Sequence, residues 1–484
     1  MIALVVVVLA AAGYGGYRLL RTDDEGSASA VGPAASSTVS TVSSGTTGPG
    51  ATTGTTDNSG TSGTTTAPGS ATSTTSPTLA PQKLSLQSNP GAASVDITLS
   101  DGTTVTGKTP FSQVIPGGQI SLKLSLSGHN PLTRTLELTK ARSITVWLDP
   151  AGLLYQSVIR FKTGPNPKQV AFSPDGKELW VSDLGGYGVE VFDPGSGKKL
   201  AQVKLGAHGA VEVIFTRDGK TVYASQMETA SVYEIDRATR TVKRILKTGG
   251  TWTKVLALSP DEKTLYAANW VSNNVSEIEL ATGKLKRLIK TVTTPRGLYV
   301  TPDGERLFVA GYDKGDIQRI TLATGASKIL LHTGGAMRHM VGDDANGLLY
   351  ADDMLYGQVY VVDLATESVR KLAKTDKEPN TIDLSPDGKV LYVSNRGKNN
   401  PKSYYIPGPE WGSVLAIDTA TGKILDAIVG GNQCTGLDVS PDGKLLAFSD
   451  FLDNRIRVYS IPDYQTLVGG GGGRAISHLK DLAK

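Results

Sequence analysis

The sequence predicts an all-β protein whose main domain is a seven-bladed β-propeller. An apolar run, a turn related to Ser-Pro-Asp-Gly and a second apolar run recur seven times. The third turn residue falls at Asp175, Asp218, Asp261, Asp303, Ala345, Asp387 and Asp442, so the steps are 43, 43, 42, 42, 42 and 55 residues. This period, without helical apolar periodicity, is typical of four-stranded propeller blades.

Each repeat contains two turns and therefore two hairpins. Proline presets φ in the first turn, aspartate bonds its own backbone, and glycine adopts a positive φ at little cost. A second turn opens 18 residues after the marker at Asp193, Asp236 and Asp363. Residues 156–163 form a strand with no blade of its own, so we expect it to complete blade seven and remove the open edges. Residues 464–468 are the alternative closing strand.

A tetrapeptide shortly after each marker carries a family resemblance. The seven copies are residues 180–183, 223–226, 266–269, 308–311, 350–353, 392–395 and 447–450, most of which begin with an aromatic residue and end with Asp, Asn or Gln. They resemble the YVTN family of β-propellers, which occurs in surface-layer-like and secreted proteins. The resemblance covers residues 155–468 and implies the fold, whereas it implies no single activity because one fold hosts many chemistries.

The first 21 residues predict a membrane anchor. Residues 1–17 carry no charged side chain, and with Leu19 and Leu20 the apolar stretch is long enough to span a bilayer. A signal peptide cleaved near residues 10–12 is the alternative. Arg18 and Arg21 follow the stretch, where positive charge normally marks the cytoplasmic side, so a start upstream of Met1 and a longer receptor are a further hypothesis.

Residues 22–82 predict a disordered linker, because Ser, Thr, Gly and Pro dominate and cannot offset the ordering entropy. About 50 such residues reach roughly 40 Å. A linker of this composition suits an exported protein. We therefore expect a single-pass protein of the cell membrane with its folded domains outside the cytoplasm.

Residues 83–150 predict a small β domain with alternating strands at 95–99, 120–126 and 144–148. Turn landmarks at residues 89–92, 107–110, 116–118 and 127–131 resemble a PEGA domain, which is a small β-sandwich. The first landmark lacks the glutamate of Pro-Glu-Gly-Ala. The resemblance implies a surface spacer, either without a ligand or in contact with wall glycan.

Bulk composition excludes several classes of protein. A net charge of +4 over 484 residues and no basic cluster argue against nucleic-acid binding. The single cysteine, Cys434, rules out internal disulfides and is expected to be buried. No nucleophile elbow, metal-binding histidine pair or phosphate loop is present, so no catalytic residue is assigned and no cofactor is expected.

Residues 469–484 predict a Gly-rich C-terminal tail with a short helix. We expect the protein to be a monomer.

Cationic residues recur at one register. Seven positions before the markers stand Lys168, Val211, Lys254, Arg296, Arg338, Asn380 and Thr435, of which four are cationic. A ring of like charges at a channel mouth would attract an anion. The alternative is that these cations pair with Asp183, Asp353 or Asp450. His339, beside Arg338, is expected to face the channel.

Large apolar or aromatic residues recur just after the tetrapeptides, at Leu184, Met227, Trp270, Tyr312, Met354 and Phe451, with Arg396 at the same place in repeat six. They form either a stacking platform for a ligand or packing between blades. Trp270 and Tyr312 distinguish the two, because a platform leaves them accessible and packing buries them.

The long sixth step places an insertion within residues 396–412. Insertions in repeat proteins gather on the binding side. Tyr404, Tyr405 and Trp411 make this loop a candidate ligand surface, together with Arg396.

The ends of the tetrapeptides offer an alternative metal site. Asp183, Gln226, Asn269, Asp353, Asn395 and Asp450 form a collar whose ligand types suit a lactonase-like hydrolase. A nearby cationic ring would oppose a divalent metal. We therefore predict a non-enzymatic, membrane-anchored binding module for a cell-envelope glycan, peptide or protein at the insert-bearing face. A channel metal hydrolase and a sensor part of a longer receptor are the alternatives.

Overall fold

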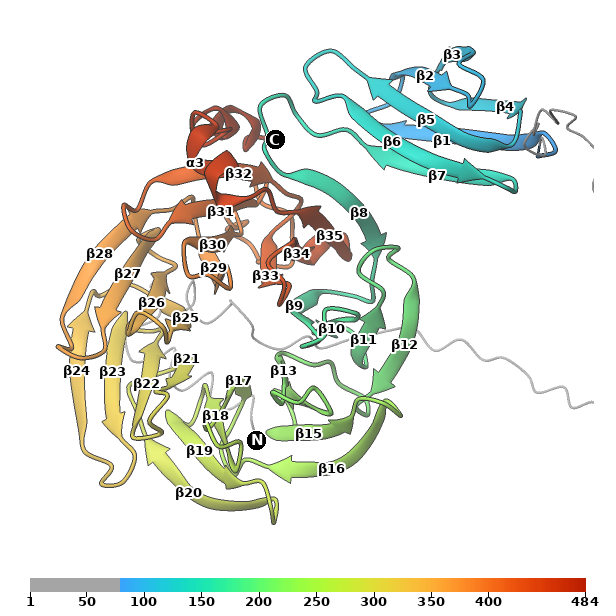
Figure 1. The fold of residues 1–484 in the computed structure, drawn as a ribbon. Helices are drawn as coiled ribbons and strands as arrows, with labels where there is room; N and C mark the ends of the chain where they lie inside the picture. The colour runs from blue at the N-terminus through green and yellow to red at the C-terminus, as the bar shows by residue number, and fades with distance from the viewer. Residues whose placement is uncertain (1–78) are drawn as a thin grey trace, which may run out of the picture.

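The computed structural model describes residues 79–484 and arranges them as a small β-sandwich beside a ring of seven four-stranded sheets (Figure 1). The predicted membrane anchor and nearly all of the predicted linker fall outside these residues. Between residues 79 and 484, none of the helices has the length and apolar character needed to cross a membrane.

The sandwich spans the first seven strands. One sheet has the order β4 (Phe111–Ile115), β1 (Gln82–Asn89), β7 (Arg142–Trp147), and the other has the order β3 (Thr104–Lys108), β2 (Ser94–Thr98), β5 (Gly118–Ser125), β6 (Leu132–Leu138). Alternation drives the packing, since Ile120, Leu122 and Leu124 of β5 are buried and their neighbours face solvent. β1 and β7 pair in parallel.

Blades one to four follow the predicted repeats. Blade one holds β9 (Pro167–Phe172), β10 (Leu179–Asp183), β11 (Gly188–Phe192) and β12 (Lys199–Lys204). Blade two holds β13 (Val213–Phe215), β14 (Thr221–Gln226), β15 (Ser231–Asp236) and β16 (Thr241–Lys247). Blade three holds β17 (Thr253–Leu258), β18 (Thr264–Asn269), β19 (Asn274–Glu279) and β20 (Lys284–Lys290). Blade four holds β21 (Pro295–Val300), β22 (Arg306–Gly311), β23 (Asp316–Thr321) and β24 (Ser327–His332).

Blades five to seven complete the ring. Blade five holds β25 (Met337–Asp343), β26 (Leu348–Asp353), β27 (Gln358–Asp363) and β28 (Val369–Lys374). Blade six holds β29 (Pro379–Leu384), β30 (Val390–Asn395), β31 (Ser413–Asp418) and β32 (Ile424–Val429). Blade seven holds β33 (Cys434–Val439), β34 (Leu445–Asp450), β35 (Arg455–Ser460) and β8 (Gln156–Lys162).

β8 closes the ring as predicted. It pairs antiparallel with β35, with Ile159 opposite Val458 and Arg160 opposite Arg457. The alternative closing segment, residues 464–468, is wrong for this role because it lies in helix α3 (Tyr464–Gly469). The Asp463 side chain accepts a hydrogen bond from the Thr466 backbone N–H at 2.9 Å, and this N-cap favours helix over strand.

Packing between neighbouring blades forms the core. All five residues of β10 are buried, whereas the outer strand β20 is almost entirely exposed. One apolar cluster joins blade seven to blade one through Val170, Val181, Ala447 and Val458. The Cys434 thiol is buried, and burial raises its pKa well above the usual value. Its burial confirms the structural role expected from the sequence.

The C-terminal tail packs beside blade six and the inserted loop. In the short 3-10 helix η2 (Ser477–Asp481), His478 Nε2 lies 3.0 Å from Asp376 Oδ2. The Trp411 backbone N–H donates to the Leu482 carbonyl at 2.7 Å. Ile476 and Leu479 of the tail are 81% and 54% accessible, so these two apolar side chains face solvent.

Ring closure predicts a stability effect at Phe161. This side chain of β8 contacts Phe192 of blade one, with ring centroids 4.6 Å apart. We expect Phe161→Ala to lower the free energy of unfolding by about 2 kcal/mol, below the ~3–5 kcal/mol of a fully buried phenylalanine, because Phe161 is only half-buried. The midpoint of urea denaturation measures this change in the free energy of unfolding.

Ile245→Ala is the matched control, because Ile245 lies on outer strand β16 and is 50% exposed. Its midpoint should stay close to that of the parent chain. Equal midpoints for the parent and Phe161→Ala would contradict closure of the ring through β8.

Candidate functional site

The four predicted cations stand on or at the inner strands, where they surround one end of the central channel. Lys168, Lys254, Arg296 and Arg338 belong to β9, β17, β21 and β25, and their exposed fractions are 3%, 0%, 6% and 1%. The four cations therefore occupy equivalent positions of the inner strands, as the sequence predicts, but other side chains bury them.

The predicted aromatic layer lies directly on this cationic ring. Lys254 Nζ is 3.5 Å from the ring centroid of Trp270. Lys168 Nζ is 5.5 Å from that of Phe451, and the Arg338 guanidinium is 5.9 Å from that of Tyr312. Cations desolvated against aromatic faces are stabilised by the ring quadrupole. The two layers thus form a single stack.

Trp270 and Tyr312 are packing residues by the exposure criterion. They are 7% and 5% accessible, and their ring centroids lie 4.9 Å apart. They pack with Ala336 and Met354 in one apolar cluster. This burial agrees with the packing interpretation rather than with an open platform.

Neighbouring positions of the cationic register also contact one another. With the Asn380 amide oxygen turned toward Arg338, Arg338 Nε and Nη2 both donate to it at 2.9 Å. His339 is largely buried, and burial followed by the charges of Arg296 and Arg338 lowers its pKa to about 3. His339 Nδ1 lies 3.4 Å from the backbone N of Ile382 in blade six. It therefore acts as a neutral group between blades.

In blades two and five, the collar side chains Gln226 and Asp353 hold the loop that enters the inner strand. Asp353 accepts hydrogen bonds from the Ala336 backbone N–H at 2.9 Å and from Thr333 Oγ1 at 2.7 Å. Gln226 Nε2 donates to the carbonyls of Leu205 and His208 at 2.9 and 2.8 Å.

The close approach of a collar side chain requires glycine in the loop that enters the inner strand. A Cβ at Gly335 would lie 2.1 Å from Asp353 Oδ2, and one at Gly250 would lie 2.2 Å from the Asn269 amide. Asn269 Nδ2 donates to Asn274 Oδ1 and Ser276 Oγ at 2.8 Å, and Asn395 Nδ2 donates to the Val393 carbonyl at 3.1 Å. The hydrogen bonds of Asn269 and Asn395 therefore stay within their own blades.

The collar carboxylates differ in charge state. Burial, reinforced by the charge of Glu190, raises the pKa of Asp183 to about 8. Asp450 is also buried, yet Arg457 and Arg455 hold its pKa below the usual value, with Arg457 Nε at 2.7 Å and Arg455 Nε at 3.0 Å. Within residues 79–484, no three His, Cys, Asp or Glu side chains are grouped so as to hold a metal ion.

The inserted loop covers the channel mouth. Tyr404 stacks on Phe451 of blade seven with centroids 5.6 Å apart, and Tyr405 lies 6.0 Å from the same ring. Leu184, Val211 and Met227 complete this cluster from blades one and two. The insertion thus reaches across the ring and buries the cations below it.

Arg396 and Gln433 brace the inserted loop. Arg396 Nη2 donates to Gln433 Oε1 at 2.7 Å, and its guanidinium lies 4.7 Å from the Tyr404 ring centroid. Gln433 Nε2 donates to Asn399 Oδ1 at 3.0 Å and to the Tyr404 carbonyl at 2.6 Å. Since Gln433 precedes the inner strand of blade seven, the loop is fixed to two blades.

A cavity of about 540 Å³ opens beside this loop, between blades five and six. Its polar walls include Asp376, Glu378, Lys398, Asn399 and Asn400, and its apolar walls include Tyr312, Met354, Tyr356 and Tyr404. Of the candidate binding residues from the sequence, Tyr312 and Tyr404 line it. Lys168, Lys254, Arg296, Arg338, His339, Trp270, Arg396 and Tyr405 lie outside its walls, as does Trp411, which contacts the tail.

Sequence reasoning missed Tyr356, Asp376 and Glu378. Tyr356 lies in the loop between β26 and β27, which corresponds to the loop of blade one that contains Tyr187. Asp376 and Glu378 precede the inner strand of blade six. Both the loop between the second and third strands and the loop before the inner strand lie on the insert-bearing face, and this placement could have indicated the three residues. No repeat pattern in the sequence marks them.

Comparisons with known proteins agree with this architecture. Residues 82–150 match the PEGA domain, and residues 219–431 match the YNCE-like β-propeller. The two matched segments follow the order of the two domains in the structure, with the PEGA domain before the β-propeller. These matches support the resemblance to a PEGA domain and a propeller drawn from the sequence.

Two proteins resemble parts of the chain. Antigen Lp49 of Leptospira interrogans is 47% identical over 126 residues, which are 26% of this chain and 28% of the antigen. Hydrazine synthase of Kuenenia stuttgartiensis shares the fold with a TM-score of 0.54 and 21% identity, covering 62% of this chain and 97% of that one. At that identity the likeness concerns the propeller fold alone.

Asp183 predicts a pH dependence of stability. Its pKa of about 8 in the folded state exceeds the ordinary value of 3.8, so the folded chain keeps a proton that the unfolded chain releases. Stability attributable to this group therefore falls as pH rises from 3.8 to about 8. Asp183→Asn should remove that slope and raise the melting temperature by a few degrees above pH 8.

Asp450→Asn should behave in the opposite way. The pKa of Asp450 is lowered, so its charge stabilises the fold at neutral pH. The substitution leaves Arg457 without this carboxylate and leaves Arg455 with Asp453 alone. Melting curves of both variants from pH 5 to pH 9 make the comparison. Parallel pH profiles for the parent and Asp183→Asn would disprove the raised pKa.

Proposed function

We propose that this protein is a non-enzymatic recognition module of the cell envelope whose propeller binds a glycan in the cavity between blades five and six. The cavity walled by the inserted loop is the observation that carries the proposal. A volume of about 540 Å³ lies within the range of small-molecule sites and admits a short saccharide.

The chemistry of the walls favours a neutral, hydroxyl-rich ligand. Asp376 and Glu378 are balanced by Lys377 and Lys398, so the cavity has no excess of either charge. Carboxylates accept hydrogen bonds from sugar hydroxyls, and side-chain amides both accept and donate them. Tyrosine rings pack on the apolar faces of sugar rings. The buried cationic ring does not contribute to these walls.

The polar groups are already oriented by bonds within the protein. Glu378 Oε1 accepts from the Asn399 backbone N–H at 2.9 Å, and Asp376 Oδ2 lies 3.0 Å from His478 Nε2. Asp353 Oδ1 accepts from the backbone N–H groups of Leu355 and Tyr356 at 3.1 and 3.2 Å. Preorganisation of this kind reduces the entropy lost on binding.

The proposal places the folded domains outside the cytoplasm. The apolar N-terminal stretch and the Ser/Thr/Gly linker are typical of a tethered exported protein. The similarity to an antigen of Leptospira interrogans is in keeping with exposure at a cell surface. In this arrangement the PEGA domain spaces the propeller from the membrane.

Protease treatment of intact cells tests the location. Full-length protein in the membrane fraction should be degraded by an external protease while a cytoplasmic marker survives. Survival of the propeller until the cells are lysed would overturn the proposed location without affecting the binding site.

Tyr356 provides the sharpest test of the cavity. It is 47% exposed and lines the cavity, so Tyr356→Ala should weaken glycan binding about tenfold, since ~1.4 kcal/mol of aromatic contact corresponds to that factor. Titration calorimetry with a saccharide selected from a glycan array measures the change. The fold should remain intact because about half of the side chain lies in solvent.

Tyr187→Ala is the matched control. Tyr187 lies in the corresponding loop of blade one, one position later, is 60% exposed and does not line the cavity. Binding should be unaffected by this change. Equal affinities for both variants would place the ligand elsewhere, and binding of peptides but no saccharides would replace glycan by peptide as the ligand class.

A further inference from the structure

A second cavity lies where the PEGA domain, blades six and seven and the C-terminal tail meet. It has a volume of about 280 Å³. Leu148 and Pro150 of the PEGA domain, Arg160 and Arg457 of blade seven, and Arg474 and Asp481 of the tail all contribute to its walls. Three guanidinium groups thus face one space together with a single carboxylate.

Two of these arginines are direct cross-strand neighbours. Arg160 of β8 stands opposite Arg457 of β35 in the register of blade seven. Like charges directly opposite on antiparallel strands are destabilising. The pKa of Arg160 is lowered mainly by burial and also by the charge of Arg457, which is consistent with this repulsion.

The protein's own acids compensate this cluster only in part. Arg457 Nε is bound to Asp450 at 2.7 Å, and Arg474 is paired with Asp481. Arg160 has weaker contacts, because its Nη2 lies 3.7 Å from Asp149 Oδ1 and its Nε is 3.4 Å from Ser157 Oγ. Asp481 is 41% exposed, so its charge is partly screened by solvent.

Aromatic and apolar residues keep the arginines in place. The Arg160 guanidinium lies 5.8 Å from the ring centroid of Trp147 and 6.0 Å from that of Tyr459, and Nη2 donates to the Tyr459 hydroxyl at 3.2 Å. The side chain is 16% exposed and that of Arg474 is 5% exposed. A positively charged, partly desolvated space with a fixed shape attracts anions strongly.

We propose that this cavity is a binding site for a tetrahedral oxyanion, such as phosphate, sulfate or a phosphate monoester group. Arginine forks match the oxygens of such groups. Of the three arginines, Arg160 has the most distant acid, since Asp149 lies 3.7 Å away, so its guanidinium is the one best placed to take a further anion. The volume admits the anion with a small substituent rather than a large ligand. Because the arginines and Asp481 come from blade seven and the tail and other wall residues come from the PEGA domain and blade six, the bound anion joins the PEGA domain and the tail to the ring.

Titration calorimetry and thermal melting of the full-length protein test this site. Inorganic phosphate and sulfate are compared with chloride at equal ionic strength, and glycerol phosphate is tested beside them. We expect phosphate to raise the melting temperature by several degrees, since a ligand that binds only the folded state stabilises it. Tighter binding of glycerol phosphate than of free phosphate identifies the source as a phosphate monoester.

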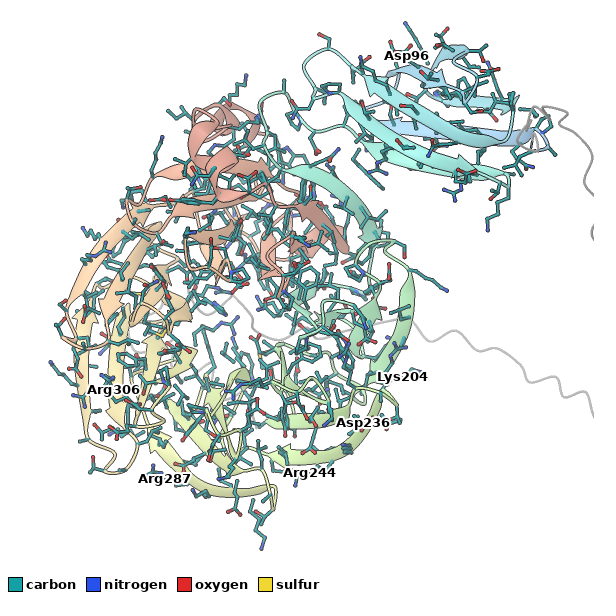
Figure 2. The ribbon with its side chains drawn as sticks, in the orientation of Figure 1. Asp96, Lys204, Asp236, Arg244, Arg287 and Arg306 are labelled. Atoms are coloured by element: carbon teal, nitrogen blue, oxygen red, sulfur yellow. The ribbon has the colours of Figure 1, made fainter. Side chains whose placement is uncertain are left out.

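Arg160→Gln and Arg474→Gln should each weaken phosphate binding at least tenfold. Two variants are used so that one remains informative when the other unfolds. Arg287→Gln is the control, because Arg287 is an ion-paired arginine on β20, across the ring from the PEGA domain (Figure 2). Phosphate affinity that is unchanged in both cavity variants, or equal shifts with chloride, would overturn the proposal.

Discussion

The pairing of β8 with β35 is the constraint on which the rest of the structure depends. Blade seven has three strands of its own, and an open ring would expose the unpaired edge of β35. The strand that follows the PEGA domain fills this edge, so the first and last parts of the propeller are joined by backbone hydrogen bonds. Closure then brings the equivalent loops of seven blades to one face.

This closure explains why charged residues at a common register end up in the interior. Lys168, Lys254, Arg296 and Arg338 converge at the channel, where repulsion would be severe in a dry space. Aromatic rings at the next layer and the Asn380 amide contact these cations. The inserted loop of blade six then covers the stack, which shifts the accessible cavity toward blades five and six.

β8 also connects ring closure to the position of the PEGA domain. Asp149, at the end of that domain, accepts a hydrogen bond from the Ser157 backbone N–H at 2.6 Å and lies beside Arg160. Leu153 and Tyr155 pack into the core of blades six and seven. The junction is therefore built of packed residues, so the strand that closes the propeller also carries the domain contact (Figure 1).

The sequence by itself determined the architecture, because repeat spacing and turn chemistry are local properties. The markers from Asp175 to Asp442 predicted seven blades, and the strand at 156–163 predicted the closure. Only the tertiary structure decided which side chains are accessible, because exposure depends on what covers a residue from elsewhere in the chain. Trp270 and Tyr312 are buried under neighbouring blades, and Tyr356 and Asp376 line a cavity that no periodicity marks. The facing of Arg160 and Arg457 likewise follows from pairing between strands nearly 300 residues apart in sequence.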